Sequence, residues 1–182
     1  EGRLGSTEMK YVEGIYRFWD GLMARFPNMR IDNCAGGGRR IDLETISRAV
    51  PLWRTDYSYG TPLGYQCHTY GISLFVPQNG TGIYNADFYR SRSGYTSASV
   101  LNFQMLTRTN ETAYDFQRVY NEYRSIQGYF LKDYYPLSGF DDICGEKGWI
   151  AYQFHDAESK SGIVMAFRRR ESKNGSYSVN LR

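Results

Sequence analysis

The feature that most constrains the fold is an alternation of helical and extended patterns in the first third of the chain. Apolar residues recur at spacings of three and four over residues 9–26, which predicts an amphipathic helix. Pro27 follows directly and ends that helix, because proline lacks the N–H that a helix interior needs. A helix of this kind needs a partner for its apolar face, so the segments that follow decide the architecture.

Those segments repeat the order of extended chain and helix. A short strand is predicted over residues 29–34, broken by the glycines at 36–38. A second helix is predicted over 43–50 and a second strand over 51–57, with Pro51 at the boundary. Helices that alternate with strands indicate a parallel-sheet α/β fold. In such folds the loops that follow the strands carry the chemistry.

The middle of the chain continues the pattern less regularly. The apolar run at 72–77 predicts a buried parallel strand. Residues 78–95 are rich in glycine, asparagine, serine and tyrosine and are predicted as a loop, and a further strand is predicted over 100–106. Asn110 has the character of a helix N-cap, and a long helix is predicted from there to about residue 130.

After about residue 141 the pattern becomes antiparallel. Apolar strands are predicted over 149–155 and 162–168, and Asn174-Gly175 is a hairpin signal before a last strand at 177–181. A boundary is therefore predicted near 138–145. It separates a domain over residues 1–138 from the start of an antiparallel β-domain over residues 139–182.

Composition excludes several classes of protein. The chain has 182 residues and a net charge of only +3, which does not indicate a nucleic-acid partner. No apolar run approaches 18 residues, so no membrane span is expected. Two histidines and three cysteines without a CxxC pair do not indicate a metal site, and no cofactor motif is complete. We therefore expect neither metal nor cofactor.

Aromatic residues make up 16% of the chain, with 17 tyrosines, and two interpretations of them stay open. Tyrosine and tryptophan suit surfaces that bind sugars, because a ring stacks on the C–H face of a sugar while polar edges meet its hydroxyls. An aromatic-rich core is the simpler alternative.

The densest polar motif is the glycine loop between Ile31 and Asp42, DNCAGGGRR. It matches neither a P-loop nor a dinucleotide fingerprint, since neither the GK[ST] ending nor GxGxxG is present. Consecutive glycines let a ligand approach the backbone, whose N–H groups can donate to hydroxyls or an anion. Cys34 and Arg39 flank that surface. The alternative is a tight turn with a solvated Arg39.

The second motif is PLWRTDY, which places Asp56 at the end of an apolar strand between aromatic residues. Desolvation raises the pKa of a carboxyl group, and this is how an aspartate becomes a general acid near neutral pH. An ion pair with Arg54 or Arg39 would instead lower the pKa. Both interpretations of Asp56 stay open on the sequence.

Taken together, the motifs resemble glycoside hydrolase family 36, the microbial α-galactosidases and related enzymes. The segments DNCAGGGRRIDLE and PLWRTDY resemble the glycine loop and acid/base strand of that family. The resemblance continues in order through QCHTYGISLFVPQNGTG, YYPLSG and GWIAYQFHDAESKSGIVMAFRR, and so spans essentially the whole chain.

The resemblance implies a fold and a reaction. The fold would be α/β, the C-terminal half of a (β/α)8 TIM-type barrel followed by an antiparallel β appendage. The reaction would be retaining hydrolysis of terminal α-galactosides, which uses a nucleophile and an acid/base carboxyl about 5–5.5 Å apart. Asp56 matches the acid/base. It would protonate the leaving glycosidic oxygen and later deprotonate the incoming water.

The resemblance also implies substrate-binding residues. Cys34 with the backbone of Gly36 and Gly37 matches the loop that contacts the galactose 2-hydroxyl, a contact that tightens in the transition state. The remaining candidates close the motif or line its wall: Arg39, Trp53 and Arg54.

One expected residue is missing. The nucleophile of the family lies on an earlier strand, and nothing before Asp32 fits, because Asp20 falls within a predicted helix. A full barrel needs about 250 residues. We therefore expect this chain to be a fragment that carries the proton donor without its nucleophile and is inactive alone.

Two other functions stay open. A galactosyl transferase of the same family would use the same residues with an acceptor hydroxyl in place of water. A non-catalytic carbohydrate-binding or assembly module would suit the missing carboxylate and the many tyrosines. In each case the expected partner is a small oligosaccharide or galactoside, and homo-oligomerisation is an expectation from the family.

Overall fold

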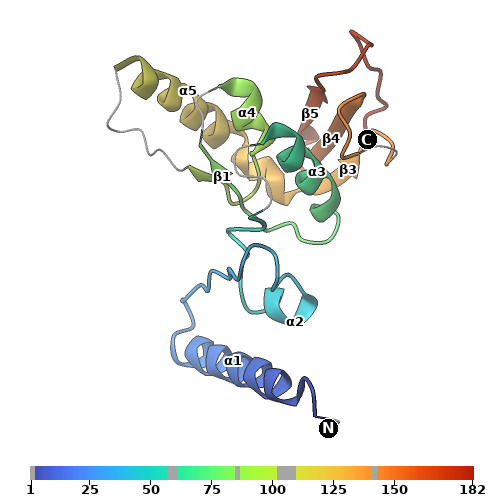
Figure 1. Ribbon diagram of the computed structural model, residues 1–182. Helices are drawn as coiled ribbons and strands as arrows, with labels where there is room; N and C mark the ends of the chain where they lie inside the picture. The colour runs from blue at the N-terminus through green and yellow to red at the C-terminus, as the bar shows by residue number, and fades with distance from the viewer. Residues whose placement is uncertain (1–2, 57–60, 85–86, 102–109, 141–142) are drawn as a thin grey trace.

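The computed structural model describes residues 3–56, 61–84, 87–101, 110–140 and 143–182, and of residues 110–114 it describes the backbone alone. The fold is mixed α/β, with a three-stranded antiparallel sheet at its C-terminal end (Figure 1). In chain order the elements are α1 (Ser6–Arg25), α2 (Leu43–Ile46), α3 (Pro62–Ile72), β1 (Gly82–Ile83), α4 (Phe88–Ser93), β2 (Val100–Leu101), α5 (Asn110–Ile126), the 3₁₀ helix η1 (Gln127–Leu131), β3 (Asp133–Pro136), β4 (Trp149–Asp156) and β5 (Ser161–Arg168).

The first predicted helix is confirmed as α1, yet none of its residues is buried. Figure 1 shows α1 at one end of the molecule, with α2 between it and the remaining elements. Polar contacts join the two helices. Arg48 Nε donates to Asp20 Oδ1 at 2.7 Å, and the Tyr16 hydroxyl lies 3.0 Å from Thr45 Oγ1. Asp20, the one carboxylate considered for the missing nucleophile, is thus part of this helix junction.

Helix α2 begins directly after its N-cap residue, Asp42, and is shorter than predicted. The Asp42 carboxylate accepts the Thr45 N–H at 2.9 Å and the Thr45 hydroxyl at 2.7 Å, a typical N-cap. The hydroxyl hydrogen bond lowers the pKa of Asp42. The helix predicted over 43–50 ends at Ile46 because Val50 forms a parallel β-bridge with Asp32 instead.

Four extended segments then lie side by side in chain order. The Val50 bridge joins residues 31–33 to the segment that starts at 50, and Gly80 exchanges hydrogen bonds with Pro51 and Arg54. Strand β1 pairs in parallel with β2. The strand predicted over 29–34 is therefore too long, since it is a single bridge at Asp32. The strand predicted over 51–57 is wrong for its described residues 51–56, which form loop and bends.

The strand predicted over 72–77 is wrong. Ile72 is the last residue of α3, and the Val76 N–H donates to the Ile72 carbonyl at 2.8 Å in the turns that follow. A short apolar run cannot be told from a helix end by periodicity alone. Pro62 at the first turn was the better signal, since proline favours that position.

The predicted loop over 78–95 is also wrong, because it contains β1 and α4. Of the strand predicted over 100–106, β2 covers the first two residues, and residues 102–106 lie outside the described part of the chain.

The antiparallel prediction for the C-terminal part is confirmed for β4 and β5, which pair from Trp149↔Arg168 to Asp156↔Ser161. Strand β3 was not predicted and pairs with the other edge of β4. The last strand and its hairpin are wrong. The chain end is instead held by side chains, since Gln153 exchanges two hydrogen bonds with the backbone of Arg182. The domain boundary stays a prediction.

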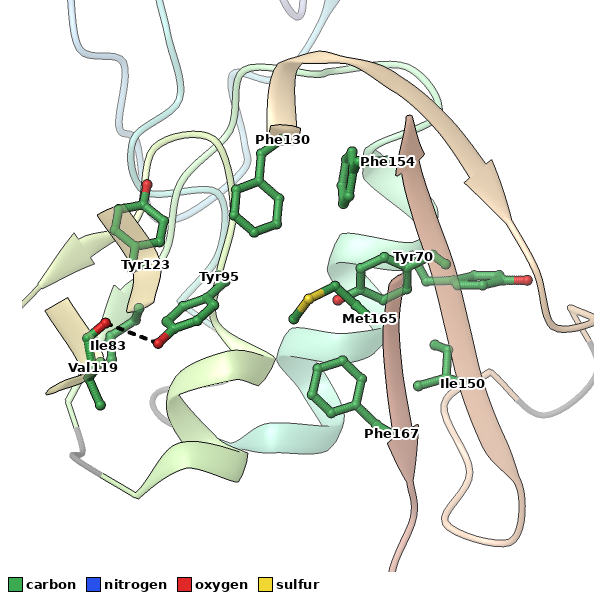
Figure 2. Close-up of a cluster of buried hydrophobic side chains, with 11 residues drawn as sticks. Tyr70, Ile83, Tyr95, Val119, Tyr123, Phe130, Ile150, Phe154, Met165 and Phe167 are labelled. Atoms are coloured by element: carbon green, nitrogen blue, oxygen red, sulfur yellow. Dashed lines mark hydrogen bonds between the residues drawn. The ribbon is translucent and has the colours of Figure 1, made fainter. Parts of the chain in front are cut away.

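The core lies between this sheet and the helices α3 and α5, and it is largely aromatic (Figure 2). Two buried tyrosines of this core direct their hydroxyls to backbone carbonyls. The Tyr95 hydroxyl donates to the Val119 carbonyl at 3.2 Å, and the Tyr123 hydroxyl to the Thr96 carbonyl at 2.9 Å. Of the two interpretations of the aromatic content, an aromatic core therefore accounts for four of the 17 tyrosines, with two more packed against it. The cluster contains Tyr70, Ile83, Tyr95, Val119, Tyr123, Phe130, Ile150, Tyr152, Phe154, Met165 and Phe167.

Among the described helices, none is long and apolar enough to cross a membrane. The described residues also contain no group of three or more histidine, cysteine, aspartate or glutamate side chains that could hold a metal ion.

Candidate active site

The glycine loop leaves the first extended segment and is closed by a buried asparagine. Asn33 Nδ2 donates to the Arg40 carbonyl at 2.7 Å, which ties the two ends of the loop together. Between them Gly36, Gly37 and Gly38 have φ angles of 53°, 57° and 27°. This left-handed region favours glycine because a Cβ there crowds the backbone. Three consecutive glycines are therefore what the turn requires.

The loop packs directly on the backbone of the second motif. A Cβ on Gly37 would lie 2.2 Å from the Asp56 nitrogen and 2.7 Å from the Thr55 carbonyl carbon. A Cβ on Gly38 would lie 2.6 Å from the Arg54 carbonyl oxygen. The structure thus brings the two sequence motifs into contact. The contact is between backbones, and it leaves no room for a side chain at Gly37 or Gly38.

Asp56 lies at this contact with its side chain exposed. The indole N–H of Trp53 donates to Asp56 Oδ1 at 2.7 Å. The guanidinium of Arg54, one of the two ion-pair partners considered from the sequence, is directed to Asn79 and α3 instead. An exposed carboxylate with a neutral hydrogen-bond donor is able to exchange a proton with a bound ligand.

Arg54 is buried, with 3% of its surface exposed, and it joins neighbouring segments. Its guanidinium donates to Asn79 Oδ1 at 2.8 Å, to the Tyr65 carbonyl at 3.0 Å and to Thr69 Oγ1 at 2.8 Å. Burial lowers the pKa of Arg54 to about 10, so the side chain stays charged at neutral pH. The structure gives Arg54 a role in holding α3 against the site loops. Its predicted part in substrate binding stays a prediction.

Replacing Arg54 with methionine in the full-length protein is expected to destabilise it by about 2–4 kcal/mol, because buried acceptors lose their donor. Urea denaturation measures the change. Arg118→Met is the matched control, since that side chain is about half exposed, and it should change the free energy of unfolding by less than ~0.5 kcal/mol. Equal effects of the two substitutions would contradict the anchoring role.

The remaining predicted residues surround the loop. Cys34 is exposed and carries a free thiol. The Arg39 side chain runs along Gly36, with its Cδ 3.5 Å from the place of a Gly36 Cβ. The Trp53 ring meets Tyr84 edge-on, with ring centroids 6.2 Å apart. These side chains lie at the same end of the extended segments as Asp56.

The cysteines differ sharply in their expected reactivity. Burial raises the pKa of Cys67 to about 12, and its thiol donates to the Ile143 carbonyl at 2.8 Å. Because the thiolate is the reactive form, iodoacetamide at neutral pH should label Cys34 and Cys144 in the native protein long before Cys67. Peptide mapping by mass spectrometry measures this, and denatured protein is the control. Comparable labelling of Cys67 under native conditions would contradict its burial.

Two residues of the site were missed by the sequence reasoning. Asn33 closes the glycine loop, and its place between Asp32 and Cys34 at a predicted strand end was an available signal. Gly82 in β1 lies against the Trp53 ring, where a Cβ would be 2.7 Å from the ring atom Cζ3. Nothing in the sequence near Gly82 indicated that contact.

Comparison with known proteins supports the resemblance predicted from the motifs. Residues 2–88 match the family Melibiase. α-Galactosidase C of Emericella nidulans is 34% identical over 87 residues, which is 42% of this chain and 12% of the relative. α-Galactosidase AgaA of Geobacillus stearothermophilus is 24% identical over 183 residues, which covers 91% of this chain and 24% of the relative. This chain therefore spans about a quarter or less of these relatives.

Solved structures agree in fold. The crystal structure of the GH36 α-galactosidase AgaA from Geobacillus stearothermophilus superposes with a TM-score of 0.75 at 23% identity, over 99% of this chain and 26% of that one. The galactosidase domain of the α-galactosidase–sucrose kinase AgaSK gives a TM-score of 0.74 at 22% identity, over 94% of this chain and 25% of that one. The resemblance to glycoside hydrolase family 36 is confirmed.

Proposed function

We propose that this member of the GH36-type α-galactosidases carries the acid/base part of a retaining active site for terminal α-galactosides. The observation that carries the proposal is the contact between the glycine loop and the backbone of Asp56. It brings the backbone of the glycine loop next to Asp56. The names of the relatives, which are α-galactosidases, support the substrate class.

In this proposal the four adjacent extended segments and their helices form the C-terminal half of a (β/α)8 barrel. Residues 1–138 belong to it, and residues 139–182 begin the antiparallel β-domain. In such barrels the catalytic groups lie at the carboxyl ends of the strands. The positions of Cys34 and Asp56, each after an extended segment, support this arrangement.

The residues have distinct proposed roles. Asp56 protonates the glycosidic oxygen as the bond to the anomeric carbon breaks, then takes a proton from the water that attacks the covalent intermediate. Cys34 and the backbone of Gly36 and Gly37 contact the galactose 2-hydroxyl, and Arg39 borders that subsite. Trp53 forms the wall of the subsite beside Asp56. Arg54 holds the loop that carries both residues against α3.

The nucleophile in this proposal belongs to a part of the enzyme that precedes residue 32. A double displacement needs two carboxyl groups, so the 182-residue chain alone is expected to be inactive. Asp20, which pairs with Arg48, does not take this role. Retaining hydrolysis by the isolated chain would contradict this part of the proposal.

The test of the function uses the full-length gene product and an α-galactoside with a poor leaving group, such as melibiose. Proton NMR of the first-formed galactose should show the α-anomer before mutarotation, because two inversions retain configuration. The corresponding β-galactoside and α-glucoside are controls and should react far more slowly. First formation of the β-anomer, or no hydrolysis of the α-galactoside, would contradict the proposal.

A further inference from the structure

We propose that Trp53 is a positioning residue for Asp56, and that Gly82 sets the place of its indole ring. This inference rests on the proposed acid/base role of Asp56. It starts from the hydrogen bond of 2.7 Å between the Trp53 indole N–H and Asp56 Oδ1. The two residues are three positions apart in the same loop segment, so the contact is local.

The chemistry of the indole decides which carboxyl oxygen carries the proton. Indole nitrogen is a donor only, so Asp56 Oδ1 must accept in every protonation state that keeps this hydrogen bond. The acidic proton is then favoured on Oδ2, because the carbonyl oxygen of a carboxylic acid accepts a hydrogen bond better than its hydroxyl oxygen does. The indole thereby fixes both the rotation of the carboxyl group and the oxygen that faces the glycosidic bond.

The indole is itself held by β1. A Cβ on Gly82 would lie 2.7 Å from Cζ3 and 2.8 Å from Cη2 of the Trp53 ring, so no larger residue leaves the ring in place. Tyr84 meets the ring edge-on at an interplanar angle of 85°. Gly82 pairs with Val100 in the parallel ladder, which fixes its backbone. Glycine is therefore needed here for the ring and not for a left-handed backbone.

The positioned oxygen serves both steps of the proposed reaction. In the first, the nucleophilic carboxylate of the proposed enzyme bonds to the anomeric carbon, the glycosidic C–O bond breaks, and the Oδ2–H proton passes to the glycosidic oxygen so that the leaving sugar departs as an alcohol. In the second, Oδ2 accepts a proton from water as the water oxygen bonds to the anomeric carbon and releases the nucleophile. A misplacement of about 1 Å can cost roughly 10²-fold in rate, so the hydrogen bond should matter kinetically.

The experiment compares Trp53→Phe and Gly82→Ala in the full-length protein. Phenylalanine keeps an aromatic ring but removes the donor, and alanine displaces the ring. Each should lower kcat/KM for melibiose by roughly 10–100-fold and lower kcat/KM for an activated aryl galactoside by a clearly smaller factor, since a good leaving group needs no proton. Trp149→Phe is the matched control, because it loses an indole hydrogen bond to Asn174 in the β-domain. It should change neither value.

A double-mutant cycle separates positioning from general damage. If Trp53 acts through Asp56, Trp53→Phe should cost nothing further in an Asp56→Ala background. Equal losses on both substrates, or an additive loss in the double mutant, would overturn the positioning role. If Asp56→Ala itself shows no dependence on the leaving group, the proposed function of Asp56 fails instead, so the two failures are distinguishable.

Discussion

Replacing Asp56 with alanine in the full-length protein is expected to lower kcat/KM for melibiose by about 10²–10⁴-fold, the usual contribution of a general acid. The loss should be far smaller on an aryl galactoside whose phenolate leaves without protonation. The reason is that only the first substrate needs the proton that Asp56 supplies. Steady-state kinetics on both substrates measure the difference.

Azide provides a second readout of the same variant. The covalent intermediate that accumulates without a general base can be attacked by azide, an anion that needs no deprotonation. The expected product is an α-galactosyl azide, because the second inversion restores the configuration. Azide should therefore raise kcat of Asp56→Ala on the aryl substrate and leave the unmodified enzyme unchanged.

The control for Asp56→Ala is Asp115→Ala, which removes an exposed carboxylate on α5 that lies 3.8 Å from Arg118. This substitution should leave the kinetics on both substrates unchanged. An Asp56→Ala enzyme with equal activity on both substrates would refute the assignment of the acid/base.

Local sequence signals predicted the elements whose apolar residues repeat at a regular spacing. The helix α1 and the strands β4 and β5 were predicted because their apolar residues repeat at helical or strand spacing. β5 shows the expected alternation, with Met165 and Phe167 buried and Ala166 exposed between them.

Strands that depend on neighbours could not be predicted from sequence in the same way. Strand β1 is two residues long within a glycine-rich stretch, and it forms because Gly80 fits between the carbonyls of Leu52 and Ala98. The run at 72–77 has the apolar character of a strand but only continues from α3 into turns. For β1 tertiary contacts outweigh the local pattern, whereas the run at 72–77 follows the local hydrogen bonds of a helix end.

The candidate site also contains residues that local sequence predicted and a side-chain orientation that it could not predict. The motifs and their order were readable in the sequence, and through the resemblance they predicted Cys34, the glycines and Asp56 as site residues. The direction of Arg54 was not readable, because it depends on Asn79 and Thr69, which the fold brings close from positions 25 and 15 residues away. Burial of a charged group is set by such partners and not by its own segment.

The contact that joins the two motifs leads to the last prediction, a large loss on replacing Gly37 with alanine. The new Cβ would lie 2.2 Å from the Asp56 nitrogen, and main-chain atoms cannot turn aside as the end of a side chain can. The φ of 57° adds about 1–3 kcal/mol of strain for a residue with a Cβ. The loops should separate, and kcat/KM on melibiose should fall by roughly 10²-fold or more.

Gly36→Ala isolates the cause of that loss. Gly36 has nearly the same φ, 53°, but its Cβ would meet only the Arg39 side chain, at 3.5 Å. Both substitutions carry the backbone strain, and only Gly37→Ala drives a Cβ into the backbone of the acid/base segment. Urea denaturation and kinetics of the full-length variants should therefore show a clearly larger loss for Gly37→Ala. If the two variants behaved alike, backbone strain alone would explain why these positions are glycine. The backbone contact with Asp56 would then not be the reason for glycine at position 37.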